Sequence, residues 1–286
     1  MAAAPPEVSN SAASLVELRG MALAREPDRY LAATLAPAGL RYDLVVLAAF
    51  AAEIARIADL VGEPLAGEIR LQWWRDALIG ESADAAAGHP VAMAMRATIA
   101  RFALPATTVE GVIDAQADVL HGERPVDEAA LRARMAASEG GLFRLAARIC
   151  AGPDADGSMD DDAETADLAG LAYGVSRALV SRRADGDALL LIPHSLVTDA
   201  DLAEHARVTL ARGALRRLAH AAHADVAARM RHMSRRRRLA YLPLAMVKPN
   251  LRALEREADK QWARPDDTLP IGRLLRIAWA HVSGRM

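Results

Sequence analysis

The sequence RYDLVVLAAFAAEIARIADLV, residues 41–61, decides the fold class of this chain. Its apolar residues recur every three or four positions, which predicts a helix. Apolar side chains occupy most of the helix circumference, so we expect this helix to lie deep in the fold. It nevertheless carries Glu53, Arg56 and Asp59, and buried charges are costly unless they are paired or functional. Because Glu53–Arg56 and Arg56–Asp59 both have i,i+3 spacing, one interpretation is a structural ion-pair cluster and the other is a functional site.

The same helical periodicity continues on both sides of this segment, and no alternating strand pattern appears between turn signals. We therefore predict an all-α chain whose helices are separated where proline or glycine interrupts the pattern. We expect residues 1–10 to be a flexible N-terminus and residues 11–286 to form a single domain. The expected helices lie near residues 11–24, 28–36, 41–61, 65–80, 90–103, 107–121, 127–136, 139–151, 162–183, 200–206, 208–232, 235–257 and 270–284.

Composition excludes several classes of protein. The chain is 52% hydrophobic and 25% charged with a net charge of −2, which is typical of a globular protein and not of a disordered one. The single cysteine, Cys150, excludes an intramolecular disulfide and Cys-based zinc or iron–sulfur sites, and it fits a reducing cytosol. The longest apolar run, residues 44–52, is far shorter than the roughly 20 residues of a membrane span. Since the N-terminus also lacks the features of a secretory signal, we expect a cytoplasmic bacterial protein.

The densest cluster of unusual residues is GEIRLQWWRD, residues 67–76. On a helix, Arg70, Trp73 and Trp74 share a face, whereas Arg75 points elsewhere. An arginine beside an indole can stack by cation–π contact or hold a diphosphate with its fork of donors. The alternative is a tryptophan anchor in the core with an arginine that extends to the surface.

Together with DRYL (residues 28–31) and FAAEIARIAD (residues 50–59), this cluster resembles the squalene/phytoene synthase family. The resemblance extends from about residue 20 to the end of the chain. The cluster at 67–76 looks most like one branch, which contains bacterial proteins of unassigned role and a mitochondrial assembly factor for respiratory complex I. The resemblance continues in LAGLAYGV (residues 168–175), LIP (residues 191–193) and LPLA (residues 242–245).

This resemblance implies an isoprenoid (terpenoid) synthase-type helical bundle with a central apolar cavity. In the active enzymes, two Asp-rich motifs on facing helices hold Mg²⁺ ions, which neutralise the diphosphate of prenyl substrates. The chain departs from both motifs, because Asp59 and Asp185 are the only acids left. The positions that match the first motif are Ala55, Arg56 and Asp59, and those that match the second are Arg177, Val180, Ser181 and Asp185.

We therefore predict no metal site and no confident catalytic set, with Asp59, Asp185 and Glu53 as remnant acids. Glu53 is a poor substitute because it lies about 120° around the helix from Asp59. The residues expected to contact a ligand are Arg56, Arg70, Trp73, Trp74, Tyr173 and Arg177.

The function predicted from these departures is non-catalytic. The protein would bind an isoprenoid or another lipid in the cavity, without a cofactor, or act as an assembly factor that contacts a respiratory complex I subunit. The alternative is an active prenyltransferase that uses Mg²⁺ to condense two prenyl diphosphates head to head. Fold alone does not choose between these functions.

Residues 211–260 contain 13 Lys and Arg against four acids, and Arg235, Arg236, Arg237 and Arg238 are consecutive. The favoured interpretation of these arginines is a solvated helix start after Ser234, and the alternative is a face that contacts a protein partner or the anionic lipids of the inner membrane. Nucleic acid is not an expected partner, because no aromatic residues are interleaved for base stacking. In the same segment His220 and His223 have a possible metal-ligand spacing, but no third ligand is evident, which favours ordinary surface histidines.

Overall fold

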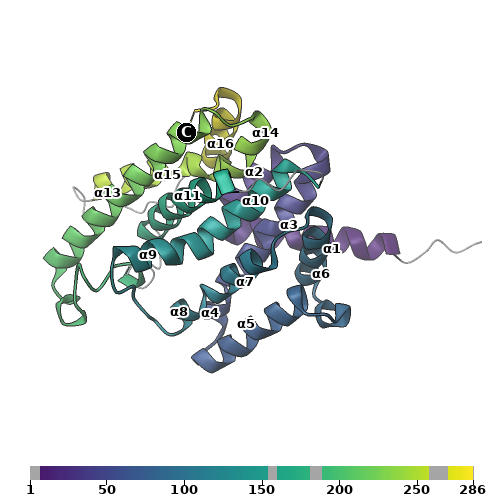
Figure 1. Cartoon of the computed structure of the whole chain (residues 1–286), viewed down its shortest axis with the longest axis horizontal. Helices are drawn as coiled ribbons and strands as arrows, with labels where there is room; N and C mark the ends of the chain where they lie inside the picture. The colour runs from purple at the N-terminus through teal and green to yellow at the C-terminus, as the bar shows by residue number, and fades with distance from the viewer. Residues whose placement is uncertain (1–6, 154–159, 181–188, 258–269, 286) are drawn as a thin grey trace, which may run out of the picture.

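The computed structural model describes residues 7–153, 160–180, 189–257 and 270–285. These residues form helices and no strand (Figure 1), which confirms the all-α prediction. The α-helices are α1 (Glu7–Arg25), α2 (Pro27–Thr34), α3 (Ala38–Ala55), α4 (Ile57–Leu60), α5 (Pro64–Ile79), α6 (Pro90–Phe102), α7 (Ala106–Asp114), α8 (Ala117–Leu120), α9 (Glu128–Met135), α10 (Gly141–Ala151), α11 (Asp160–Leu179), α13 (His205–Met230), α14 (Arg235–Arg238), α15 (Val247–Glu257) and α16 (Pro270–Ser283). Shorter 3₁₀ or π segments are η1 (Ala83–Ala86), η2 (Ala136–Gly140), η3 (Asp199–Asp201) and η4 (Leu239–Met246).

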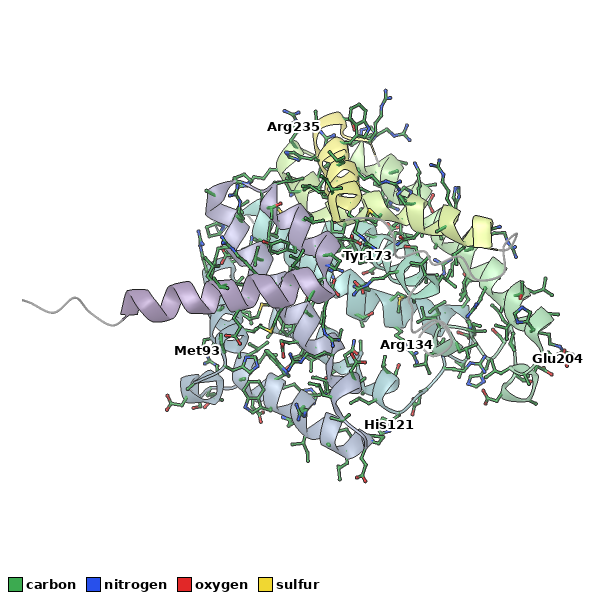
Figure 2. The ribbon with its side chains drawn as sticks, turned by 180° about the vertical axis from the view of Figure 1, so that it is seen from behind. Met93, His121, Arg134, Tyr173, Glu204 and Arg235 are labelled. Atoms are coloured by element: carbon green, nitrogen blue, oxygen red, sulfur yellow. The ribbon has the colours of Figure 1, made fainter. Side chains whose placement is uncertain are left out.

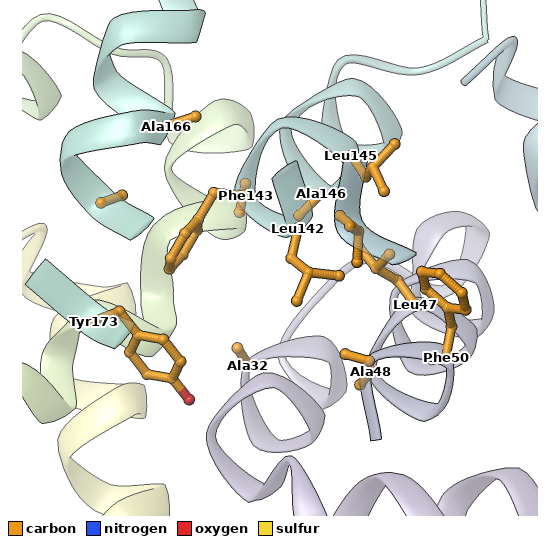
Figure 3. Packing of buried hydrophobic residues seen from close by; sticks show 14 of the residues in the cluster. Ala32, Leu47, Ala48, Phe50, Leu142, Phe143, Leu145, Ala146, Ala166 and Tyr173 are labelled. Atoms are coloured by element: carbon orange, nitrogen blue, oxygen red, sulfur yellow. The ribbon is translucent and has the colours of Figure 1, made fainter. Parts of the chain in front are cut away.

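Helix α3 forms the centre of the bundle, as the sequence predicts. It packs against α1, α2, α6 and α10, and most of its residues are buried. Figure 3 shows Leu47, Ala48 and Phe50 of α3 packed near Leu142 and Leu145 of α10. On the other side of α10 lies α11, which packs against α13, α15 and the π-helical turn η2. Helices α3 and α11 therefore both pack against α10. The family resemblance predicts a central cavity in this part of the bundle.

The helices predicted at 41–61 and 235–257 are interrupted in the structure. The helix expected at 41–61 breaks at Arg56, where Arg56 pairs with Glu53 while Asp59 turns to Arg25 of α1. The helix expected at 235–257 contains the 3₁₀ stretch η4, because Pro243 cannot donate the hydrogen bond that a continuous α-helix needs.

Two further boundaries differ from the sequence prediction. The helix expected at 107–121 is divided between Asp114 and Ala117 into α7 and α8. Helix α1 begins at Glu7, so residues 7–10 of the expected flexible N-terminus are helical, and residues 1–6 lie outside the described residues. No helix in the described part of the chain is long and apolar enough to cross a membrane.

The two histidines of α13 differ in their surroundings. His220 is exposed, but His223 is buried, so the expectation of a surface histidine is wrong for His223. Burial, followed by the positive charge of Lys248, lowers the pKa of His223 to about 4. His223 is therefore neutral in the folded protein at neutral pH, whereas an unfolded histidine titrates near its ordinary pKa of about 6.5.

Acidification should destabilise the protein through His223. Between its two pKa values the unfolded chain binds a proton that the folded chain does not, so the free energy of unfolding falls as the pH drops. We expect a loss of roughly 2–3 kcal/mol from neutral pH to about pH 4 that is absent in His223→Gln and kept in His220→Gln. Urea denaturation across this pH range measures it, and equal acid sensitivity of His223→Gln and the wild type would contradict the assignment.

Candidate functional site

A cavity of about 710 Å³ lies between the C-terminal part of α3 and helix α11. Its volume falls within the usual range of small-molecule pockets. Residues of α1, α2, α4, α7, α8, α9, α10, α15 and α16 and of the turn η2 also contribute to its wall. Its apolar lining includes Ala51, Ile54, Ala55, Val112, Val119, Met135, Leu142, Leu190 and Leu191.

Charged residues enter the cavity wall at the start of α2. Pro27 occupies the first turn, where a missing N–H costs nothing, and Glu26 precedes it as the N-cap residue. Glu26 is buried and forms ion pairs with Arg177 of α11 at 2.6 Å and with Arg29 at 3.3 Å. Burial raises the pKa of Glu26 above its ordinary value, and the opposing effect of Arg177 and Arg29 reduces this rise.

Arg29 links α2 to the turn η2 and to helices α10 and α11. Its side chain is buried and pairs with Glu139 of η2 as well as with Glu26. Its guanidinium lies over the ring of Phe143 at 4.8 Å and over that of Tyr173 at 5.1 Å. Those two rings meet edge to face, with centroids 5.8 Å apart, and Figure 3 shows them on neighbouring helices. Although burial opposes its charge, Glu139 and Glu26 raise the pKa of Arg29, so the guanidinium stays charged.

Asp28 accepts hydrogen bonds from two other elements. The Tyr173 hydroxyl donates to Oδ2 at 3.2 Å, and Nη1 of Arg273, on α16, donates to Oδ1 at 2.8 Å. Burial and then the charge of Asp28 raise the pKa of Tyr173 well above its ordinary value. Tyr173 therefore stays protonated and acts as a donor at neutral pH.

The sequence model of the squalene/phytoene synthase family matches residues 24–274. This chain belongs to the squalene/phytoene synthase family. Its fold is similar to the crystal structure of a dehydrosqualene synthase in complex with ligand, with a TM-score of 0.77 and 11% identity over 96% of this chain and 98% of that chain. It is also similar to the squalene synthase HpnC from Alicyclobacillus acidocaldarius, with a TM-score of 0.64 and 20% identity over 86% and 97% of the two chains. No curated protein matches the sequence significantly.

The two structural likenesses confirm the predicted isoprenoid synthase-type bundle, and at these identities they concern the fold alone. The structure contains a cavity between α3 and α11, as the family resemblance predicts. What the cavity of this chain does depends on its own side chains.

Each carboxylate in the described wall of the cavity has an arginine partner. Besides the pairs of Glu26, Asp28 and Glu139, Asp59 pairs with Arg25 at 2.7 Å. Mg²⁺ is usually held by carboxylate oxygens of the protein together with phosphate oxygens of the substrate. In this cavity the carboxylates of Glu26, Asp28, Asp59 and Glu139 are already paired with guanidinium groups. No three His, Cys, Asp or Glu side chains in the described residues are arranged to hold a metal. The described residues therefore do not fit the magnesium cluster that the family resemblance implies.

The structure shows the surroundings of most residues that match the two Asp-rich motifs. At the first, Asp59 lines the cavity, whereas Arg56 turns away from it to pair with Glu53 at 2.9 Å. Of the two possible ion pairs, Glu53–Arg56 forms, whereas Asp59 pairs with Arg25. At the second, Arg177 lines the cavity, and Asp185 lies outside the described residues.

The tryptophan pair of α5 packs in the core and does not line the cavity. Trp74 is buried and meets Phe50 edge to face at 5.7 Å, while both tryptophans pack against His89. Arg70 is exposed on the same helix. The structure thus brings Tyr173 and Arg177 together at the cavity but places Arg70, Trp73 and Trp74 elsewhere, as a core anchor would be placed.

Five charged residues of the site were not predicted from the sequence to contact a ligand: Glu26, Asp28, Arg29, Glu139 and Arg273. A local signal existed for the first three, which stand together where one helix ends and the next begins. No comparable signal marks the other two, because their partners are 110 and 245 positions away along the chain.

Proposed function

We propose that this protein binds an isoprenoid or another lipid with an anionic head group, without Mg²⁺ and without catalysing prenyl transfer. The observation that carries this proposal is the pairing of Glu26, Asp28, Asp59 and Glu139 with arginines in the cavity wall. A magnesium-dependent diphosphate enzyme needs such carboxylates for its ions.

The cavity offers two kinds of surface to a lipid. The apolar side chains from α3, α7 and α10 suit a prenyl or acyl chain, whose burial supplies most of the affinity. Arginines on the opposite side suit an anionic head. Arg177 is about one-third exposed (34%), and a guanidinium has five N–H donors, more than its present partners use. An anion can therefore bind Arg177 while the pair with Glu26 remains.

The cellular role that we propose is assembly of a respiratory complex, with a complex I subunit as the partner. Support for this role comes from the segment 67–76, which resembles the branch containing a complex I assembly factor. That segment lies on α5, away from the cavity, so its exposed side remains accessible to a protein partner. We also propose that the protein is cytoplasmic and contacts the inner membrane, because residues 211–260 are strongly basic.

Binding and turnover can be separated with purified protein. Farnesyl diphosphate should bind with the same affinity in Mg²⁺ and in EDTA by calorimetry, and no diphosphate should be released. Arg177→Lys, which keeps the charge but loses the fork geometry, should weaken binding about tenfold. Arg132→Lys changes an exposed arginine outside the cavity and should leave the affinity unchanged.

Magnesium-dependent turnover would contradict the proposal. Release of diphosphate and formation of a head-to-head product, both lost in Asp59→Ala, would instead establish the prenyltransferase alternative. Asp185→Ala provides the same test for the second motif position.

A further inference from the structure

Helix α16 carries a row of exposed apolar side chains on its outer side. Their spacing of four, four and three residues places them on one face of the helix. The opposite side of the helix is buried through Ile277 and Ala280, so the outer row is not part of the core. The row consists of Ile271, Leu275, Trp279 and Val282, which are 60%, 63%, 68% and 68% exposed.

Basic side chains surround this row. Arg276 is exposed beside the row on the same helix, and Arg285, which is also exposed, follows the end of that helix. Helix α14 lies near α16 (Figure 1), and Figure 2 shows its first residue, Arg235, on the same side of the molecule. Arg235 and Arg238 line a pocket of about 220 Å³ together with residues 280–284 of α16. The Nε atom of Arg238 is buried there without a hydrogen-bond partner among the described residues.

The face has no acidic counterpart in its own elements. No Asp or Glu occurs between Asp225 and Glu255, which includes α14 and η4, or in residues 270–286. A similar apolar pair on α5, Leu65 and Ile69, is equally exposed but stands beside Glu63 and Glu68. Large exposed apolar groups ringed by one sign of charge mark an interaction surface, and positive charge selects a negative partner.

We infer that α16 and α14 together form a membrane-docking face for a bilayer that contains anionic phospholipids. The row on α16 inserts into the boundary between head groups and acyl chains, where Trp279 is favoured. The arginines of α14 bind the phosphates of the head groups, and the pocket of Arg235 and Arg238 takes one of them. The sequence offers only the arginine contact, as one alternative, and the structure adds the apolar element beside it.

This inference is independent of what the cavity binds, but the two features share a helix. From the inner side of α16, Arg273 reaches Asp28 in the cavity wall, whereas Leu275 and Trp279 face outward. A docked α16 would therefore be both the membrane contact and part of the wall of the lipid cavity.

Flotation with lipid vesicles tests the face in the full-length protein. Vesicles of equal parts phosphatidylcholine and phosphatidylglycerol should bind the protein, and pure phosphatidylcholine should not. Leu275→Glu should lower the partition coefficient about tenfold. Leu65→Glu is the matched control, since Leu65 is 64% exposed and Leu275 is 63% exposed, and it should change binding less than twofold.

Charge is tested in the same assay. Arg235→Glu should weaken binding about fivefold or more, while Arg19→Glu, which changes an exposed arginine of α1, should not. Binding should also weaken steeply as salt is raised. Equal binding to pure phosphatidylcholine, insensitivity to salt, or an equal loss in Leu65→Glu would overturn the inference. A stable dimer by light scattering that Leu275→Glu dissociates would also overturn it, because a second copy would then cover the row.

Discussion

Arg29→Met should lower the free energy of unfolding by about 3–5 kcal/mol, because Glu26 and Glu139 lose one of the two cations that they share and keep only Arg177. Glu26 is almost wholly buried, and the side chain of Glu139 is only 18% exposed. Methionine keeps an unbranched stem of similar length, so packing against Phe143 and Tyr173 changes less than the charge. Removing one partner of a buried ion pair is strongly destabilising, since the remaining charge keeps its desolvation cost.

Two further variants identify the origin of this effect. Arg29→Met combined with Glu139→Gln should recover about 1–2 kcal/mol of the loss, because one of the stranded charges is removed. Arg132→Met removes an exposed partner of Glu128 and should cost less than about 1 kcal/mol. Urea denaturation followed by circular dichroism measures all three variants. A loss in Arg29→Met no larger than that in Arg132→Met would show that the network does not hold the site together.

The sequence was sufficient to predict the helical class and the central position of α3. Both depend on the spacing of apolar residues along one segment, and burial of such a stripe is a local property of that segment. The break at Arg56 was not predictable in this way. It accompanies the pairing of Asp59 with Arg25, which depends on where α1 lies and not on the helix pattern.

The site was predicted only where its residues fall within a family motif. Tyr173 and Arg177 are at the cavity as expected, because they lie in a stretch that resembles the family. Arg70, Trp73 and Trp74 looked equally unusual in the sequence, yet an indole pair fills a core as well as it binds a ligand. The sequence cannot distinguish these roles. Only the packing of Trp74 against Phe50 and His89 shows that the indoles lie in the core and not in the cavity lining.

The arginines explain how a family fold can keep its cavity while the described residues lack a magnesium cluster. A carboxylate near a guanidinium needs no metal to balance its charge, and the pair also links separate helices. Asp28 ties α2 to α11 and α16 in this way, and Glu139 ties η2 to α2. These pairs link separate elements, so the pairs of Glu139 with Arg29 and Arg177 depend on the position of the turn that carries Glu139.

Gly170→Val is the variant expected to disturb that position most. A Cβ atom on Gly170 would lie 2.3 Å from the backbone nitrogen of Gly140 and 2.8 Å from the carbonyl oxygen of Met135. Both contacts are with backbone, so no side-chain rotation relieves them, and η2 must move away from α11. We expect a loss of about 3 kcal/mol or more in the free energy of unfolding.

Gly213→Ala provides the matched control, because Gly213 is also a glycine within a helix and an added Cβ there meets only Arg217 at 3.7 Å. That variant should stabilise the protein by about 0.5–1 kcal/mol, through the better helix propensity of alanine. If Gly170→Val instead unfolds with the wild-type midpoint, the close approach of α11 and η2 is not what fixes Glu139. If it folds with reduced stability, the loss should extend to ligand binding at the cavity. Displacing η2 would separate Glu139 from Arg29 and Arg177. The close contact of Gly170 with Gly140 would then control the ion pairs in the cavity wall.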